Sequence, residues 1–383
     1  MKDKALKVAI VTHPLDSLGG AEKVLQRLLC EFPKADVFCA RSDKRFVKKW
    51  FNGVKVKNSF IQYLPFEKAL RKEFLLLYPL AYKSFSFFKY DVVISVSDAF
   101  EKFISPVSKK TKHIAYILTP PRFLWMHEDR TIKDSSSLSY KIYSKFIGTG
   151  LERVWQKWDR NAARKADVVI AISKEVAKRV KKFYDIDCDV IYPPVEIKEM
   201  RIGKEERKEN WFLYLGRVET YKGVELAIRA CNIAKKPLKI AGIGIHLEQM
   251  KELVKDLNAK GIVKFLGFFE DSEKPELLRK CKALLFPVQN EDFGIVPVEA
   301  NACGTPVIAY RQGGALETIS EENPKTGVFF DEYTPESLAA VIKEFDSDDF
   351  DAACCRKQAT QFAGEIFQYK IRNLVDEVIK SSK

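Results

Sequence analysis

Two glutamates flank a short glycine-containing segment in the second half of the sequence. Glu291 lies in the loop NEDFG, after the apolar run ALLFPV, and Glu299 follows eight residues later. Between them, Pro297 stands where proline is best tolerated, in the first turn of a helix. Amides at a helix start attract anions, and a carboxylate can accept two sugar hydroxyls. The pattern indicates a ligand with a phosphate and hydroxyl groups, although Glu299 could merely cap the helix and Glu291 be solvated.

Two cations follow the first apolar run of the same half. Arg217 and Lys222 lie in YLGRVETYKGVELAI, where a strand pattern gives way to a helix pattern. A planar guanidinium and an ammonium at this spacing can converge on a diphosphate, although such a pair is also common on ordinary surfaces. Gly244, in AGIG, ends another expected strand, where a missing side chain lets backbone approach a ligand closely.

Short apolar runs alternate with amphipathic patterns and must position these residues. Continuous apolar runs of this length are typical of parallel strands that are covered on both faces. Strand patterns span 6–13, 35–40, 90–97, 112–118, 166–173, 211–216, 237–244, 262–268, 281–288 and 305–310, and helix patterns span 21–32, 224–234, 246–260 and 274–282. The predicted fold class is α/β, with two doubly wound Rossmann-like domains and a cleft between them.

The alternation breaks at residues 195–210, where Pro193-Pro194 and a charged segment follow one another. We therefore predict an N-terminal domain over 1–196 and a C-terminal domain over 208–360. Basic charge is concentrated in the first: residues 1–196 contain 37 Lys and Arg against 22 Asp and Glu, and residues 197–383 contain 28 against 30. Such an asymmetry indicates an anionic partner, or simply a lysine-rich surface.

A membrane is one such partner. The segment 66–90 combines Lys and Arg with Leu, Phe and Tyr, as in a helix that lies on anionic lipid, but it could equally pack on its own sheet. No recognition-helix motif indicates nucleic acid as a partner. The eight cysteines form no CxxC pair and no cluster with histidine, which favours free thiols in a reducing compartment. We expect a cytoplasmic protein without a signal peptide or membrane span, either soluble or peripheral on the inner face of a membrane.

Two longer motifs carry a resemblance to a known family. EDFGIVPVEANACGTPVIAYRQGGALET (291–318) and WDRNAARKADVVIAISKEVAKRVKKFYDIDCDVIYPPVE (158–196) resemble segments of glycosyltransferase family 4, the retaining nucleotide-sugar transferases of GT-B fold. The likeness points to the bacterial mannosyltransferases of O-antigen and other surface glycans. It implies a donor such as GDP-mannose, a lipid-linked or polysaccharide acceptor, no cofactor and no metal ion. It also implies that a last helix, at about 365–383, returns to the first domain.

The resemblance assigns roles to single residues. Arg217 and Lys222 would bind the donor pyrophosphate and stabilise the leaving nucleotide, with Glu291 at the transferred sugar. Glu299 would hold the ribose. The other expected donor-binding positions are Gly19, Gly20, Gly244, Phe293, Gly294, Ile295 and Val296.

Three residues of the first domain are acceptor-side candidates. Leu118 stands where the family usually has the histidine of Tyr-x-His-Thr-Pro, and Asp98 where it has that of Ser-His-Ala. Leu118 cannot exchange a proton, whereas Asp98 could take a polar role. His13, which ends the first strand pattern beside the glycine pair, is the third. These departures leave a second function open, that of a nucleotide-sugar-binding protein that has lost catalysis and serves as a partner subunit.

Overall fold

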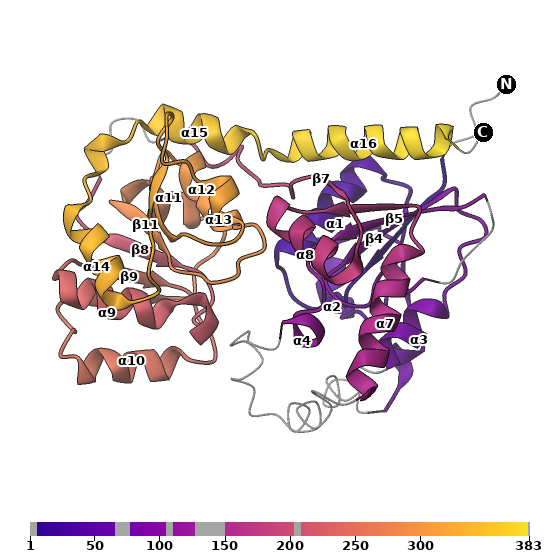
Figure 1. Ribbon diagram of the computed structural model, residues 1–383, viewed down its shortest axis with the longest axis horizontal. Helices are drawn as coiled ribbons and strands as arrows, with labels where there is room; N and C mark the ends of the chain where they lie inside the picture. Colours follow the sequence, from indigo (N-terminus) through magenta and orange to yellow (C-terminus); the bar gives the residue numbers. More distant parts are fainter. Residues whose placement is uncertain (1–5, 66–76, 105–109, 127–149, 203–207, 382–383) are drawn as a thin grey trace. The chain divides into compact units, whose positions relative to one another are not determined.

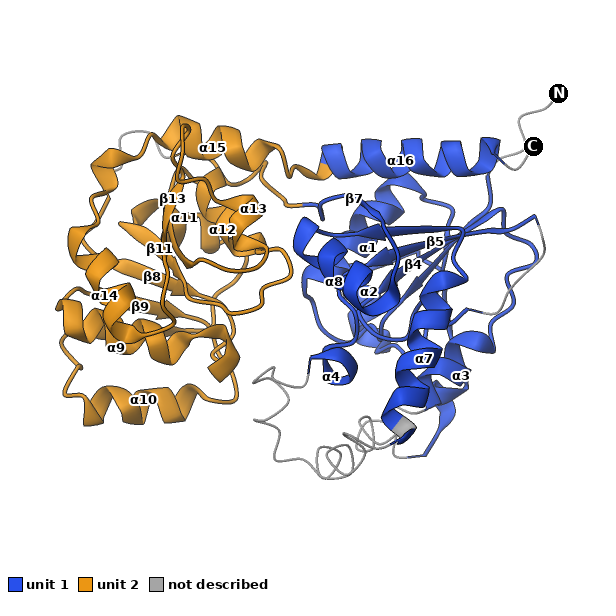
Figure 2. Ribbon diagram, in the orientation of Figure 1, with its two compact units in different colours: residues 1–194, 365–383 blue, residues 195–364 orange. Residues whose placement is uncertain are grey.

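The computed structural model describes the chain except residues 1–5, 66–76, 105–109, 127–149, 203–207 and 382–383 (Figure 1). It forms two compact units: unit 1 comprises residues 1–194 and 365–383, and unit 2 comprises residues 195–364 (Figure 2). The stretch after Pro194, where the alternation of strand and helix patterns breaks, begins inside unit 2, and its Val195 amide donates to the Phe362 carbonyl at 3.0 Å.

Unit 1 is built on a parallel sheet whose described strands follow the order β3-β2-β1-β4-β5-β6-β7. Every residue of β1 and β4 is buried, as expected of strands that are covered on both faces. The strands are β1 (Val8–Thr12), β2 (Asp36–Cys39), β3 (Val56–Asn58), β4 (Val92–Ser97), β5 (Lys112–Ile117), β6 (Val168–Ala171) and β7 (Asp189–Val190).

Helices cover this sheet, and one of them comes from the C-terminus. They are α1 (Gly20–Glu31), α2 (Lys44–Trp50), η1 (Phe60–Tyr63), α3 (Tyr78–Lys83), α4 (Arg122–Trp125), α7 (Gly150–Arg164), α8 (Lys174–Tyr184) and α16 (Gly364–Lys380). Helix α16, yellow in Figure 1, runs along unit 1. Arg372 of α16 donates to the Glu31 carbonyl at 3.1 Å, and the Phe367 ring lies 5.8 Å from that of Tyr116.

Unit 2 repeats the architecture with described strands in the parallel order β10-β9-β8-β11-β12-β13. The strands are β8 (Phe212–Leu215), β9 (Leu238–Ala241), β10 (Val263–Gly267), β11 (Ala283–Phe286), β12 (Val307–Tyr310) and β13 (Gly327–Phe330). The helices are η3 (Thr220–Lys222), α9 (Val224–Ala234), α10 (Leu247–Asp256), α11 (Lys274–Lys280), α12 (Ile295–Ala302), α13 (Ala315–Thr318), α14 (Pro335–Glu344), η4 (Ser347–Asp349) and α15 (Ala352–Thr360).

Each sheet has one point at which its winding reverses, between β1 and β4 in unit 1 and between β8 and β11 in unit 2. Ligands of open parallel sheets bind beyond the carboxyl ends of the strands at such a point. The predicted class of two doubly wound Rossmann-like domains is confirmed. Four predicted site residues follow the strands at these points: His13, Asp98, Arg217 and Glu291.

A buried ion pair anchors the loop that follows β4. Lys102 Nζ lies 2.6 Å from Asp159 Oδ1, with side chains only 1% and 0% exposed. Asp159 Oδ2 also accepts from the Trp125 indole at 2.8 Å, and Lys102 donates to the Ala99 carbonyl at 2.5 Å. The loop between β4 and residue 104 is thereby tied to α4 and α7.

The predicted membrane segment 66–90 is only partly described, because residues 66–76 lie outside the described ranges. Its described part contains α3, in which Tyr78, Ala81 and Tyr82 are buried in the unit 1 core. In the described parts of the chain, no helix combines the length and apolar character needed to cross a bilayer.

Replacing Lys102 with Met should destabilise unit 1 by about 3–5 kcal/mol, because Asp159 would remain buried without its counter-ion. The free energy of unfolding in urea measures this effect. Lys157→Met, on the exposed side of α7, is the matched control and should change stability by no more than about 0.5 kcal/mol. Equal stability of the two variants would contradict the importance of the pair.

Candidate functional site

The unit 2 site is built around an ion pair between two predicted catalytic residues. Lys222 Nζ donates to Glu291 Oε2 at 2.9 Å, and the side chains are 26% and 17% exposed. Gly223 makes this approach possible: its φ is +74°, and a Cβ there would lie 2.0 Å from the Pro287 carbonyl oxygen. Only glycine lets the turn that carries Lys222 pack against the end of β11.

Two further glycines support the loop that carries Glu291. The Gly314 amide donates to the Glu291 carbonyl at 2.9 Å. A Cβ on Gly314 would lie 2.4 Å from Phe293 Cα, and one on Gly313 would lie 2.6 Å from the Glu291 carbonyl oxygen. The sequence patterns predicted no role for this pair, although two consecutive glycines in the loop after β12 were the available signal.

Arg217 and Gly244 lie beyond the ends of β8 and β9. Arg217 is 67% exposed, and its guanidinium donates to Glu219 at 3.2 Å and to the Tyr221 hydroxyl at 2.5 Å. A Cβ on Gly244 would lie 2.2 Å from the Val218 carbonyl oxygen. Close packing against the Val218 backbone is therefore sufficient to require glycine at position 244.

The start of α12 has the geometry that Pro297 indicated. Gly294 caps the helix with φ +91°, and Ile295, Val296 and Pro297 form the first turn. Phe293 is buried, with its ring 5.3 Å from that of Phe362. The first turn of any helix has amides that lack intrahelical acceptors. This start thus offers backbone donors close in sequence to Glu291.

Glu299 forms an ion pair with Lys274, a residue for which the sequence patterns predicted no role. Lys274 Nζ donates to both Glu299 oxygens at 3.0 Å, with the carboxylate 1% exposed. Burial by itself would lower the pKa of the Lys274 ammonium. The attraction of the Glu299 and Asp271 carboxylates is larger, so the pKa of Lys274 is raised overall. No sequence pattern distinguishes Lys274 from the surface lysines of neighbouring helices, so only the fold brings this pair together.

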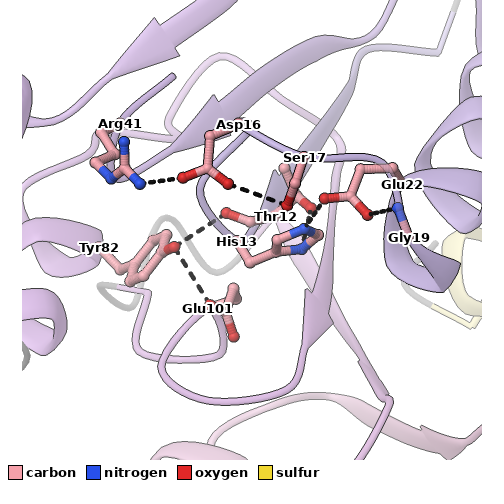
Figure 3. A network of polar contacts seen from close by, with 9 residues as sticks. All are labelled: Thr12, His13, Asp16, Ser17, Gly19, Glu22, Arg41, Tyr82 and Glu101. Carbon is pink, nitrogen blue, oxygen red and sulfur yellow. Dashed lines mark hydrogen bonds and ion pairs between the residues drawn. The ribbon is translucent and has the colours of Figure 1, made fainter. Parts of the chain in front are cut away.

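Unit 1 holds a polar network at the ends of β1 and β4 (Figure 3). His13 Nε2 lies 2.5 Å from Glu22 Oε1, and Glu22 Oε2 accepts from the Gly19 amide at 2.7 Å. Burial by itself would lower the pKa of the His13 ring. The hydrogen bond to Glu22 and the negative charges of Asp98 and Glu101 have the larger effect and raise the pKa of His13 to about 9. His13 is therefore an imidazolium at neutral pH.

The other acceptor-side candidates lie beyond β4 and β5. Leu118 donates its amide to the Ser97 carbonyl at 2.8 Å, so the loops after the two strands start side by side. Glu101, another residue that the sequence analysis missed, accepts from the amides of Asp98 at 3.2 Å and Ala99 at 2.9 Å. Burial and the Asp98 carboxylate raise the pKa of Glu101.

Replacing Gly314 with Ala tests the support of the Glu291 loop. The added methyl would overlap the Phe293 backbone, so we expect a loss of about 1–3 kcal/mol in the free energy of unfolding of unit 2. Gly261→Ala is the matched control, because nothing lies within 4 Å of a Cβ there. Chemical unfolding compares the two, and a G314A variant as stable as G261A would contradict the close packing.

Comparison with known proteins covers both units. A family model described as Glycosyltransferase Family 4 matches residues 18–199, and one described as Glycosyl transferases group 1 matches residues 195–362. The alpha-1,3/1,6-mannosyltransferase ALG2 of Homo sapiens is 30% identical over 202 residues, 46% of this chain and 47% of that protein. The O-antigen chain mannosyltransferase RfbU of Salmonella typhimurium is 28% identical over 204 residues, 52% and 54% of the two chains. The chain spans about half the length of the curated relatives that it matches first.

Solved structures resemble nearly the whole chain. HepE of Anabaena, solved with UDP, has a TM-score of 0.69 at 18% identity and covers 97% of this chain and 100% of its own. The lipopolysaccharide outer core galactosyltransferase WaaB has a TM-score of 0.66 at 18% identity, with 99% and 100% covered. At these identities the likeness shows the fold. Because the two family models together span residues 18–362 and the fold agrees, the chain belongs to glycosyltransferase family 4 and has a GT-B fold.

Proposed function

We propose that this chain transfers a hexose, with retention of anomeric configuration, from a nucleoside diphosphate sugar to a lipid-linked or polysaccharide acceptor in surface glycan synthesis. The observation that carries the proposal is the Lys222–Glu291 pair at 2.9 Å, which lies at the winding reversal of unit 2 beside the start of α12. It brings a cation, a carboxylate and a helix N-terminus together where a parallel sheet binds its ligand.

Cleavage of the sugar–phosphate bond leaves negative charge on the diphosphate, and fixed cations lower the barrier by stabilising that charge. Lys222 is held in place by Glu291, and its ammonium has donors to spare for a phosphate oxygen. Arg217 offers an exposed planar fork on the adjacent strand end. In this proposal the two cations and the amides of α12 supply the stabilisation without a metal ion.

Glu291 and Glu299 are proposed to bind hydroxyl groups of the donor. The carboxylate of Glu291 has one oxygen on Lys222, which leaves acceptor capacity for a hydroxyl of the transferred sugar. Both oxygens of Glu299 accept a bond from Lys274, which fixes the orientation of the carboxylate that is proposed to bind a ribose hydroxyl.

The donor is proposed to be GDP-mannose. Support comes from relatives named as mannosyltransferases, ALG2 and RfbU, at 30% and 28% identity. A panel of GDP- and UDP-sugars, assayed for transfer and hydrolysis with and without EDTA, tests the base, the sugar and the metal independence together. Turnover with UDP-sugars alone would overturn the choice of donor while leaving the transferase assignment in place.

Glu291→Ala should lower the rate of transfer by about 100-fold or more, because a contact made to the reacting sugar would be lost. Folding should be little affected, since the pair with Lys222 is partly exposed. Steady-state kinetics and thermal unfolding separate the two effects. Glu322→Ala, an exposed carboxylate of the same unit, is the control. Wild-type activity in E291A would contradict the site.

A lipid-linked acceptor would require unit 1 to work at a membrane surface, and α3 with its flanking residues has suitable chemistry. Leu80 is 52% exposed and Phe88 is 72% exposed. Lys83 Nζ lies 5.5 Å from the ring centre of Trp158, which is itself 46% exposed. Lysine beside exposed aromatic and aliphatic side chains is typical of surfaces that enter the headgroup region of anionic bilayers.

The double variant L80S/F88S should lose binding to vesicles of anionic phospholipid, since it removes the apolar contacts while leaving the net charge unchanged. Sedimentation with anionic and with zwitterionic vesicles, each at low and high salt, measures this binding. Tyr369→Ser, an exposed aromatic residue of α16, is the control. If wild-type protein fails to sediment with anionic vesicles even at low salt, the membrane proposal is wrong.

Leu118 supports a second candidate, a nucleotide-sugar-binding subunit without catalysis, because its side chain cannot exchange protons at the end of β5. The same panel distinguishes the two functions. Tight donor binding with no transfer or hydrolysis on any lipid acceptor would favour the binding protein.

A further inference from the structure

We propose that the His13–Glu22 ion pair is a latch that fixes the Gly19–Gly20 turn, beyond the carboxyl end of β1, in the geometry in which its backbone binds a phosphate-bearing ligand, which makes His13 a positioning residue of the transfer reaction. The inference rests on the proposed function. It adds a role for His13 and Glu22 that neither the sequence pattern nor the fold assigns to them.

The latch consists of contacts made by the two oxygens of the Glu22 carboxylate. Glu22 Oε1 lies 2.5 Å from His13 Nε2, and Oε2 accepts from the Gly19 amide at 2.7 Å. Glu22 thereby joins the end of β1 to the start of α1 across the loop between them (Figure 3). Because Glu22 is 4% exposed, water competes little with either bond.

Gly19 lies close to the carboxylate that holds it. A Cβ at this position would lie 3.2 Å from Glu22 Oε2, so a side chain there would require the carboxylate to shift by a few tenths of an ångström. The turn whose backbone is proposed to approach the donor is the same turn whose amide Glu22 holds.

The opposite side of the loop is also held by charge. Asp16 forms an ion pair with Arg41, whose side chain is 7% exposed, and accepts from the Ser17 hydroxyl at 3.2 Å. The Leu15 amide donates to the Arg41 carbonyl at 3.1 Å. Residues 13–22 are therefore fixed at both ends, which leaves the latch to determine how the glycine turn is presented.

The latch requires a charged His13. The titratable groups that act on the ring are Glu22 from α1 and both Asp98 and Glu101 from the loop after β4. The Tyr82 hydroxyl of α3 lies 3.0 Å from the Thr12 carbonyl oxygen and 3.3 Å from Glu101 Oε1, so it links the end of β1 to the carboxylate of Glu101. A histidine whose pKa is raised contributes its stabilisation below the ordinary value of about 6.5 and loses it as the pH rises through about 9. The latch should accordingly open on the alkaline side.

The variant Glu22→Gln separates the latch from helix capping. A glutamine can still accept the Gly19 amide, as in a capping box, but it cannot pair with an imidazolium as an ion. His13→Gln removes the charge from the other side, and the double variant H13Q/E22Q leaves no unpaired charge. Glu31→Gln, at the far end of the same helix, is the matched control, since Glu31 contacts Arg372 rather than His13.

The first measurement does not depend on activity. Titration of the His13 ring by NMR should give a midpoint near 9 in the wild type and in E31Q, and a clearly lower midpoint in E22Q. The second is kinetic: E22Q and H13Q should raise the donor KM about tenfold with kcat within about twofold, and the wild-type KM should rise as His13 deprotonates. If the protein transfers no sugar, the Kd for GDP replaces the donor KM.

The outcomes separate the two proposals. Suppose that the protein transfers no sugar, that the wild-type His13 midpoint is near 9 and that E22Q raises the Kd for GDP. The transferase proposal would then be wrong, and the latch would be supported. A wild-type midpoint near 6.5, or an E22Q variant that is less stable but has an unchanged KM or Kd, would overturn the latch. A rise of the KM in H13Q/E22Q equal to that in either single variant, rather than the sum of the two, would support the ion pair as its cause, whereas recovery of the wild-type KM in the double variant would contradict the latch.

Discussion

A parallel strand that is covered on both faces can present polar chemistry only beyond its ends. Strands β1 and β4 are buried along their entire length, and β8 and β11 are buried likewise. Candidate residues consequently follow the last residue of a central strand: His13 after β1, Asp98 after β4, Arg217 after β8 and Glu291 after β11. Since both sheets reverse their winding between these strands, each unit brings two such loops together at one edge.

Charges that gather at such an edge are costly to bury, because removing an ion from water costs several kcal/mol unless a partner compensates. Each unit meets this cost with a specific pair, Lys102 with Asp159 in unit 1 and Lys274 with Glu299 in unit 2. A pair of this kind tolerates little displacement, and so it also fixes the backbone on either side. These buried pairs therefore limit how far the segments that carry them can move, namely the loop after β4 with α7 in unit 1 and α11 with α12 in unit 2.

Most of the strands, the helices α1, α9, α10 and α11 and the approximate places of the polar residues could be predicted from the sequence. Strands that are buried on both faces leave continuous apolar runs, whereas helices such as α2, α8, α14 and α15 were not predicted. Helix α9 was expected over 224–234 and extends from Val224 to Ala234. Strands β3, β7 and β13 were missed, since β3 and β7 are short and incompletely buried and β13 follows a loop.

The partners of the site residues were much harder to predict. Lys222 and Glu291 are 69 positions apart and Lys274 and Glu299 are 25 apart, so their contacts depend on which strand ends become neighbours. Glu101 and Glu22 were missed for a related reason: a carboxylate inside a helical or loop pattern looks solvated until the fold encloses it. Glycines 223, 313 and 314 carried a signal, but only the structure shows which backbone each one admits.

Helix α16 has a consequence for how the chain acquires its structure. Because α16 packs in unit 1, unit 2 is in effect an insertion within the sequence of unit 1. During synthesis, all residues of unit 2 leave the ribosome before unit 1 receives the Phe367 ring that packs on Tyr116 and the arginine that binds Glu31. The segment made second is thus able to fold as a complete unit first, whereas the segment made first remains unfinished until the last helix emerges.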